Sequence, residues 1–525
     1  MWGTTDDAEP DSHAGSPVLV RLRLDGRRPR RWHAALIERL GERRDCRVEV
    51  DDRAGSAVWP RNADMLLRIE ALFHGLPHNG PAASPAAAVV AGWTRPRGET
   101  PDLVIDLYGD ADPADGVRVW RLGYDGRPGE AALLATLLAG RLPVASLVED
   151  GRVVSEGRLG TEVRGVVQTM FEDGLARTAM LIAAAFDGGA PAFVPPPKEP
   201  APAAEMTMSD FARRAVRIAA RTTLQHIYRI GYRSPHWRTG WRRLDGPDLV
   251  ALGRHPESGW HELPDDGRRF YADPFPIVHE GRCWLFVEEF PHATAKGVIS
   301  AVAFDDTGPV GIPVPVLETP HHLSYPFVFA RDGAVWMVPE SCAAGTIDLY
   351  RATDFPGGWV KHATLVFGIA ASDPTLFEHE GRWWLFATVR GAPTTAPLGH
   401  GSYSDALYLW SAPDFRGPWT PHRANPVLID IATARPAGRV MVRDGRIIRP
   451  VQDCSRGYGA ALGLMIVDRL DDAGFTQSLL ARIEAGPLWP GSRLHSLNTA
   501  GGFEFIDGSA RVPRFPALGF PPRRT

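Results

Sequence analysis

The chain has 525 residues, a formal net charge of −4 and four cysteines. This length suits two or three domains with their own cores, and the small negative charge argues against nucleic acid as a partner. The cysteines are scattered without metal-ligand spacing, so we predict a cytoplasmic protein with no metal or other cofactor. The polar N-terminus and the lack of a run of about 18 apolar residues predict neither a signal peptide nor a transmembrane segment. Abundant Arg, Ala, Gly and Pro are typical of a high-GC bacterial genome, and no oligomeric state is predicted.

Residues 1–16 are predicted to be a disordered tail, and residues 17–190 an α/β layer domain. Apolar runs alternate there with helical periodicity, which is the pattern of strands and helices in such a domain. Strands are expected at 18–22, 103–107 and 117–122, and a hairpin turning at Asp150-Gly151 at 144–154. Helices are expected at 32–40, 63–73, 131–138 and 163–186.

Three motifs of this domain resemble the N-terminal domain of the formyltransferases: Pro101–Leu107, Val119–Arg121 and Val153–Gly157. Members of that family use an Asn, a His and an Asp around a folate cofactor. The Asn and His have no counterpart here, and there is no glycine-rich phosphate loop. The resemblance therefore implies a fold without formyl transfer, as in a degenerate structural or docking domain.

Residues 191–207 are proline-rich and are predicted to be a stiff linker. A helix capped by Ser209 follows within residues 208–235, and its apolar side chains alternate with arginines over 209–230. One interpretation is a peripheral contact with anionic lipid. The other is a connector packed on the next domain with its arginines in water.

Residues 236–525 contain a repeated hairpin. Each copy has two strand-like runs around an acidic residue and a glycine, a pair that favours a tight turn because glycine allows positive φ. The predicted turn glycines are Gly281, Gly333, Gly381, Gly445 and Gly508. Five copies at intervals of 48 to 64 residues predict a five-bladed β-propeller. We expect the segment before Asp273, with its tryptophans, to supply a missing outer strand and close the ring.

Radial symmetry would bring repeat-equivalent residues to one channel. The strand-start position holds Asp273, Tyr325 and Asp373, and the end of the second strand holds Glu288 and Glu340. Acidic residues are depleted in strands, so their recurrence asks for a reason. Glycosidic cleavage needs two carboxylates, one ionised and one protonated, and crowding of like charges raises a pKa. The alternative is that the aspartates bond backbone N–H groups at strand starts.

Further residues are candidates for substrate binding. An arginine within an apolar strand is expected to answer a carboxylate or an anionic ligand, since its planar fork grips such groups in two places. Aromatic rings beside the channel can stack on sugar faces. The substrate-binding candidates are Tyr271, Tyr325, Arg435, Arg449, Gln452, Asp453, His495 and Asn498.

Several motifs in order resemble one family: Tyr271–Pro274, Ser324–Val328, Val338–Ser341, Ser372–Phe377 and Arg449–Ser455. It is the propeller domain found at the N-terminus of plant glucosamine inositolphosphorylceramide transferases and in bacterial relatives. The chain is similar, more distantly, to the five-bladed arabinanase, levansucrase and invertase superfamily, which includes family 43 glycoside hydrolases. In the plant enzymes sugar transfer belongs to a separate C-terminal domain, so the resemblance does not imply transferase activity here.

The family 43 resemblance implies roles for the acidic residues. Asp273 matches the general base, and Asp373 matches the aspartate that modulates a pKa. The family's acid is a Glu near the start of the fourth blade, where this chain has Arg435-Pro436-Ala437-Gly438. Either Glu340 or Glu288 replaces that acid, or hydrolysis is lost.

The sequence therefore predicts a multidomain protein with an α/β domain and an all-β propeller that acts on carbohydrate. In one hypothesis the channel binds a glycan or sugar conjugate and hydrolyses or transfers its glycosyl group. In the alternative, the propeller recognises a glycan or glycolipid headgroup without catalysis, and the α/β domain serves for docking.

Overall fold

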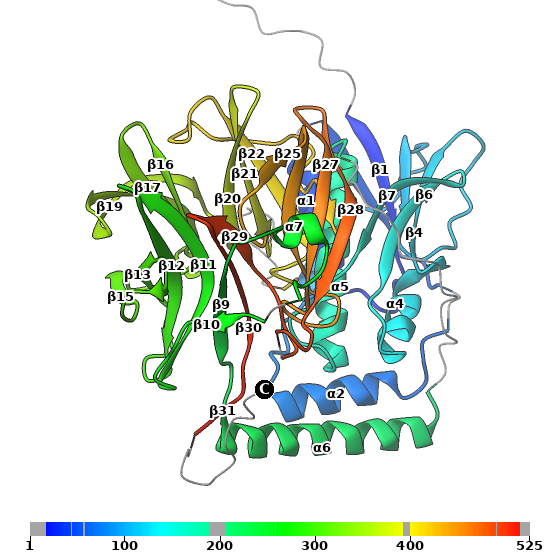
Figure 1. The fold of residues 1–525 in the computed structure, drawn as a ribbon. Coiled ribbons are helices and arrows are strands. Elements are labelled where there is room, and N and C mark those ends of the chain that lie inside the picture. The colour runs from blue at the N-terminus through cyan, green and yellow to red at the C-terminus, as the bar shows by residue number, and fades with distance from the viewer. Residues whose placement is uncertain are drawn as a thin grey trace, which may run out of the picture.

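The computed structural model describes residues 17–43, 45–55, 58–189, 206–257, 259–391, 400–489 and 491–514. Two units meet in it, an α/β domain and a ring of β-sheets (Figure 1). The predicted tail at 1–16 and most of the predicted linker at 191–207 lie outside the described residues.

The α/β domain is built on one sheet with the strand order β2-β1-β3-β4-β6-β7, and β5 pairs with β4. The first four of these run parallel, whereas β6 and β7 are antiparallel to their neighbours. The strands are β1 (Val18–Arg23), β2 (Cys46–Asp51), β3 (Leu103–Asp106), β4 (Arg118–Tyr124), β5 (Arg127–Pro128), β6 (Val144–Glu149) and β7 (Arg152–Arg158). The helices are α1 (Arg31–Gly41), α2 (Ala63–His74), α3 (Ala87–Ala91), α4 (Gly129–Leu138) and α5 (Val167–Phe186).

The predicted α/β layer is thus confirmed, together with its Asp150-Gly151 hairpin, in which both turn residues have positive φ. The last helix begins at Val167 instead of Val163. Strand β2 is not among the predicted strands, although its six residues alternate between apolar and charged side chains. It lies at the edge of the sheet, where β1 is its neighbour.

Helix α6 (Met208–Gly231) runs along the lower edge of the molecule in Figure 1. The expected cap, Ser209, is wrong. Thr207 caps the helix, since its hydroxyl accepts the N–H of Asp210 at 3.2 Å while the Asp210 carboxylate accepts the N–H of Thr207. The helix contacts the α/β domain, where Arg214 donates to the carbonyl of Leu138. Across the described residues, no helix combines the length and the apolar character needed to cross a bilayer.

Among the described residues, five sheets form the ring, and each sheet is one blade. Blade one holds β11 (Arg269–His279), β12 (Arg282–Pro291), β13 (Val298–Asp305), β14 (Gly308–Pro309) and β15 (Val314–Leu317). Blade two holds β16 (Ser324–Arg331), β17 (Ala334–Glu340), β18 (Thr346–Asp354) and β19 (Gly357–Phe367). Blade three holds β20 (Ala371–His379), β21 (Arg382–Val389), β22 (Ala406–Ala412), β23 (Thr420–Pro421) and β24 (Leu428–Ile429). Blade four holds β25 (Met441–Arg443), β26 (Arg446–Asp453), β27 (Ala461–Asp471) and β28 (Gly474–Glu484).

The fifth blade closes the ring with strands from both ends of this region. Strands β29 (Leu497–Ala500) and β30 (Phe503–Ser509) pair with β9 (Trp237–Arg243), which pairs with β10 (His261–Glu262). The predicted five-bladed propeller is confirmed, as is its closure by the segment before Asp273. That segment supplies two strands where one was expected.

Four of the five predicted hairpin turns are confirmed. At Glu280-Gly281, Asp332-Gly333, Glu380-Gly381 and Asp444-Gly445 both residues have positive φ, as two-residue hairpin turns of this twist require. The fifth is wrong, because the turn of the last hairpin is Gly501-Gly502. Asp507 and Gly508 lie instead on β30, where a Cβ on Gly508 would come within 2.4 Å of Trp489. Ala500 is consequently at the end of its strand instead of the start.

The α/β domain docks against blade three. The Arg177 guanidinium of α5 lies 2.7 Å from the Asp405 carboxylate, which also accepts the N–H of Gly160 at 2.7 Å. Arg158 pairs with Asp430 at 2.8 Å. Glycines permit the close approach, since a Cβ on Gly160 would lie 2.4 Å from the Ile431 side chain.

A buried carboxyl in the α/β domain gives a testable pH dependence. Burial raises the pKa of Glu70 on α2 to about 7 from its usual 4.5, although the carboxylate accepts the Gln168 N–H. Because the folded chain holds this proton more tightly, its stabilisation is complete below about pH 4.5 and is lost as the pH rises through 7. The free energy of unfolding should therefore fall by about 3 kcal/mol between pH 4 and pH 8. We expect the Glu70→Gln variant to lack this fall, as urea unfolding over that pH range will measure. Glu38→Gln, at an exposed site on α1, should leave the pH dependence unchanged.

Candidate functional site

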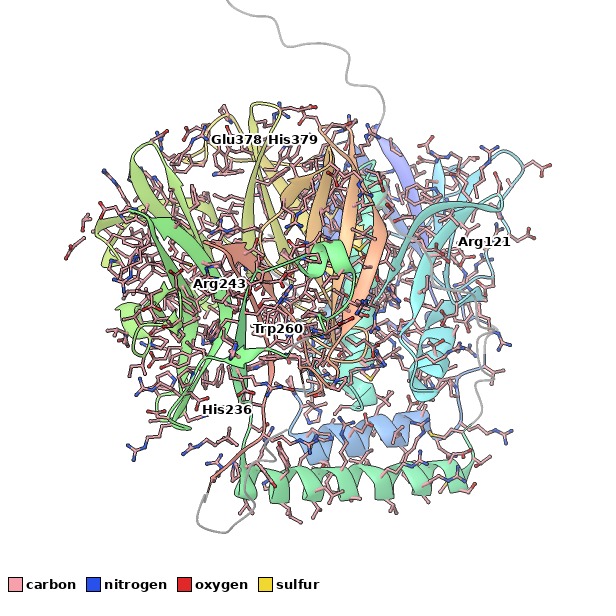
Figure 2. The ribbon with its side chains drawn as sticks, viewed as in Figure 1. Arg121, His236, Arg243, Trp260, Glu378 and His379 are labelled. Carbon is pink, nitrogen blue, oxygen red and sulfur yellow. The ribbon has the colours of Figure 1, made fainter. Side chains whose placement is uncertain are left out.

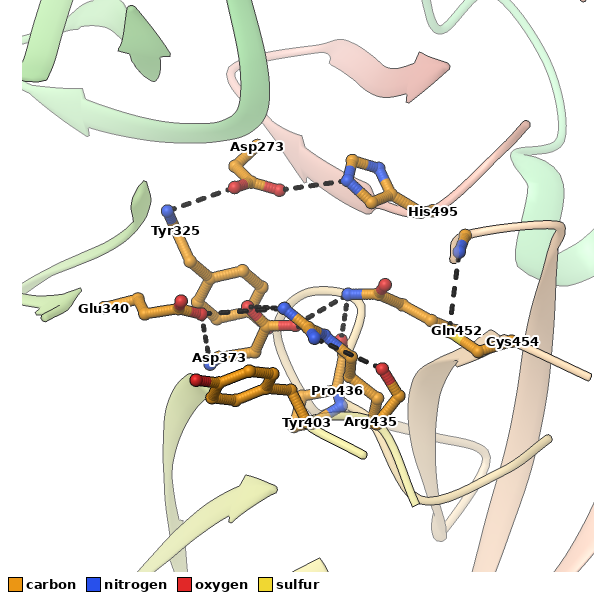
Figure 3. A network of polar contacts seen from close by, with 12 residues as sticks. Asp273, Tyr325, Glu340, Asp373, Tyr403, Arg435, Pro436, Gln452, Cys454 and His495 are labelled. Carbon is orange, nitrogen blue, oxygen red and sulfur yellow. Dashed lines mark hydrogen bonds and ion pairs between the residues drawn. The ribbon is translucent and has the colours of Figure 1, made fainter. Parts of the chain in front are cut away.

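The centre of the propeller is closed by Tyr325. Its ring packs edge-on against Phe275, and its hydroxyl contacts the Thr375 hydroxyl at 2.9 Å and accepts the Gly438 N–H at 2.8 Å. Its backbone N–H donates to Asp273 at 3.2 Å (Figure 3). Tyr325 therefore joins four blades and forms a floor for the polar groups around it.

Asp373 is the most firmly held carboxylate of the channel. Its Oδ2 accepts from Arg435 Nε and from Gln452 Nε2, both at 2.6 Å. The Arg435 side chain is only 7% exposed and also lies over the Tyr458 ring. The Arg435 guanidinium and the Gln452 amide together hold this carboxylate in place. The Gln452 Oε1, which is buried, has no hydrogen-bond partner among the described residues.

Glu340 lies beside Asp373 and Arg435. Its Oε2 accepts the N–H of Asp373 at 3.0 Å and is 3.7 Å from the Arg435 guanidinium. Burial raises the pKa of Glu340 well above its usual value, and the charge of Asp373 raises it further. A carboxyl that holds its proton more tightly than usual thus lies next to one that two side chains hold by direct bonds.

Asp273 belongs to a second buried cluster. His495 Nδ1 bonds Asp507 Oδ1 at 2.5 Å, and His495 Nε2 lies 3.7 Å from Asp273 Oδ1. Burial raises the pKa of Asp273 to about 7, against the lowering effect of His495. Burial alone would lower the pKa of His495, but Asp507 raises it above its usual value. A carboxyl that titrates near neutrality is suited to proton transfer.

Glu288 completes the set from blade one. Its Oε1 lies 3.3 Å from His322 Nε2. Burial raises its pKa well above the usual value, and the charges of Asp273 and Glu340 add to that rise. The four predicted acidic residues therefore lie in one channel and influence one another.

A pocket of about 360 Å³ opens at the channel mouth. Glu340, Arg435 and Tyr403, which are labelled in Figure 3, line it from the propeller. Glu162 lines it from the α/β domain, and its carboxylate accepts from Ser402 Oγ at 2.6 Å and from the Tyr403 N–H at 2.7 Å. The remaining lining residues are His322, Cys342, Ala343, Ala370 and Ser372.

Other predicted binding residues lie within the protein, away from the lining of this pocket. Tyr271 is in an apolar cluster between blades one and five. Asn498 donates to the Pro274 carbonyl, and Asp453 accepts from Arg482. Arg449 donates to the side-chain oxygen of Gln477 and to carbonyls of Thr433 and Ala434. The expected carboxylate partner of Arg449 is therefore wrong, and the ligand roles of these residues stay predictions.

One group in the described part of the chain is able to hold a metal ion. The ligand atoms of Asp273, His495 and Asp507 all lie within 4.8 Å of one another, and all three residues are buried. They would offer one nitrogen and two oxygens. In the sequence His495 and Asp273 are separate candidates, and no metal is predicted from them.

Several site residues were missed from the sequence. Asp507 is predicted as a turn residue, although an acidic residue so placed in a strand is the same signal that points to Glu288 and Glu340. Glu162, Tyr403 and His322 lie on segments between strands or between domains, and no repeat marks them. Only the docking of the two domains brings Glu162 to the pocket.

The fold and site define the class: a five-bladed β-propeller with a carboxylate-lined channel, joined to an α/β domain. Residues 264–501 match the family described as "Glucosamine inositolphosphorylceramide transferase 1, N-terminal". The protein of that name from Arabidopsis thaliana is 33% identical over 272 residues, covering 49% of this chain and 34% of its own length. The protein from Oryza sativa subsp. japonica is 31% identical over 260 residues, covering 46% and 34%. The chain thus spans about a third of the length of these relatives.

Solved structures that match part of this chain include a family 117 glycoside hydrolase, Zg3597, produced by Zobellia galactanivorans. It is 14% identical, covers 52% of this chain and 90% of its own, and has a TM-score of 0.33. The RS223 beta-xylosidase is 10% identical, covers 47% and 94%, and has a TM-score of 0.35.

Proposed function

We propose that the propeller binds a glycan or sugar conjugate in the pocket at the channel mouth and cleaves or transfers its glycosyl group. The observation that carries this is the pairing of Glu340 with Asp373. Arg435 and Gln452 hold Asp373 by direct bonds, whereas Glu340 borders the pocket under conditions that keep it protonated. Such a pair supplies the proton donor that glycosidic cleavage needs.

In this proposal Glu340 donates its proton to the glycosidic oxygen as the bond to the anomeric carbon breaks. Asp373 is the modulator, since its charge raises the pKa of Glu340. Asp273 acts as base on a water, or as the nucleophile, and Glu288 is the alternative acid.

The relatives' name supports the ligand class, because it joins glucosamine to an inositolphosphorylceramide. A sugar conjugate is therefore favoured over a free sugar. We propose that the α/β domain acts as a docking domain that completes the pocket through Glu162. Its formyltransferase-like ancestry, a bacterial source and a cytoplasmic location stay predictions.

The second candidate is recognition without catalysis. It is favoured by the satisfied state of the channel, where Tyr325 fills the centre and Asp273 is only 4% exposed. If a bound sugar cannot reach Asp273, the pocket has no catalytic base and can only bind the sugar.

A pocket-filling substitution tests binding. Ala343 lines the pocket and lies outside the apolar core, so Ala343→Trp should block the pocket without disturbing that core. We expect calorimetric titration with sugars and inositol phosphate glycosides to show binding to the natural chain and at least tenfold weaker binding to this variant. The control is Ala473→Trp, at the exposed turn between β27 and β28. Equal binding by both variants would place the ligand elsewhere.

A further inference from the structure

Helix α6 is long yet buries none of its residues. Its half-buried side chains, among them Phe211, Ile218 and Thr222, recur at helical spacing and face the α/β domain. In Figure 1 the helix lies on the outer edge of the molecule, below α2. The opposite side of α6 therefore faces outward along roughly 36 Å of helix.

That outward side is mostly apolar. The exposed residues Val216, Ala220, Thr223, Ile227 and Ile230 are spaced by four and three residues and fall on one stripe, and four of the five are apolar. Val216 is 68% exposed, Ile227 60% and Ile230 65%. Three large aliphatic side chains in water on one helix stripe are unfavourable unless another surface covers them.

The stripe is flanked by positive charge. Arg213 and Arg217 lie along the side of the helix next to the stripe, and Arg221 follows one turn later, with its guanidinium close to Gly165 of the α/β domain. Arg217 and Arg221 also line a groove of about 1130 Å³ between α6 and the α/β domain, whose other walls include Val166 and Met170. The helix carries five arginines and one acidic residue, Asp210, in a chain of net charge −4.

We propose that α6 is a docking surface for an anionic phospholipid bilayer, lying flat on it with the Val216–Ile230 stripe in the acyl boundary and the arginines at the phosphates. The outward apolar stripe matches the acyl boundary of such a bilayer, and the arginines beside it match the anionic headgroups. A second copy of the chain matches less well. Paired stripes would bring arginine rows together, with only Asp210 on each helix to offset them.

Vesicle flotation of the full chain tests the proposal. We expect binding to vesicles of equal phosphatidylglycerol and phosphatidylcholine, weaker binding at about 0.5 M salt and little binding to phosphatidylcholine alone. Val216→Glu/Ile227→Glu should lower the partition coefficient about tenfold or more. Arg213→Gln/Arg217→Gln/Arg221→Gln should cancel the preference for anionic vesicles.

The control is Val360→Glu/Phe367→Glu, an equally exposed apolar pair on β19, which should leave vesicle binding unchanged. Amide hydrogen exchange gives a second readout on the natural chain, with vesicles protecting residues 208–231 more than β19. Absence of binding to anionic vesicles would overturn the proposal. So would a concentration-dependent dimer in light scattering that the Val216→Glu/Ile227→Glu variant dissociates while vesicles leave 208–231 unprotected.

Discussion

Replacing Arg177 by methionine is expected to lower the free energy of unfolding by about 3 to 5 kcal/mol. The Arg177 side chain is 1% exposed and its partner Asp405 is fully buried, 2.7 Å away. Methionine fills similar space but leaves the Asp405 carboxylate without its cation. Burial already raises the pKa of Asp405, and loss of Arg177 would raise it further. The destabilisation should therefore shrink as the pH falls and Asp405 takes up a proton, which urea unfolding over a series of pH values will measure.

Two further variants isolate the charge. Arg177→Met/Asp405→Asn should recover part of the loss, because the introduced amide stays neutral and its side-chain oxygen still accepts the Gly160 N–H. The exposed pair Arg331–Glu378 is the control, and Glu378 lies at the upper edge of Figure 2. Arg331→Met should cost less than about 1 kcal/mol. A similar cost for Arg177→Met would show that the domain contact rests on packing instead.

Turn chemistry explains why most of the propeller could be predicted from the sequence. Four acidic-Gly pairs form tight turns because their backbone angles are decided by two neighbouring residues. Asp507-Gly508 has the same local signal, but contacts with residues far away in the sequence determine its conformation. Its carboxylate accepts from the Asp273 N–H, and its glycine makes room for Trp489. Local patterns cannot distinguish these two cases.

The site was predictable to the extent that the repeat places it. Asp273, Glu288, Glu340 and Asp373 share repeat positions, so the ring brings them to one channel. Arg435 and Asp373 are separate candidates in the sequence, and the direct bond between them joins residues 62 positions apart. Glu162 belongs to another domain, and it is held at the pocket by contacts between the domains, among them Arg177–Asp405 and its own bonds to Ser402 and Tyr403. Contacts between residues that are distant in the sequence cannot be identified without the three-dimensional structure.

Glu340→Gln is expected to lower kcat for glycoside cleavage by about 10² to 10⁴. Glutamine has no proton to give, yet its oxygen still accepts the Asp373 N–H, so binding and fold should persist. In the natural chain activity should extend to high pH and fall only as Glu340 ionises, since its pKa lies well above the usual value. The variant should lose that alkaline limb. A panel of 4-nitrophenyl and methyl glycosides measures both effects.

The leaving group separates acid catalysis from a general loss of function. Nitrophenolate leaves without a proton, so Glu340→Gln should harm methyl glycosides far more than 4-nitrophenyl glycosides. Glu378→Gln, on the exposed turn-side end of β20, should leave both rates unchanged. An unaffected Glu340→Gln with an inactive Glu288→Gln would move the proton donor to blade one. If no glycoside turns over while Ala343→Trp still abolishes binding, the pocket recognises sugars without cleaving them, because the channel floor then keeps Asp273 from the anomeric carbon.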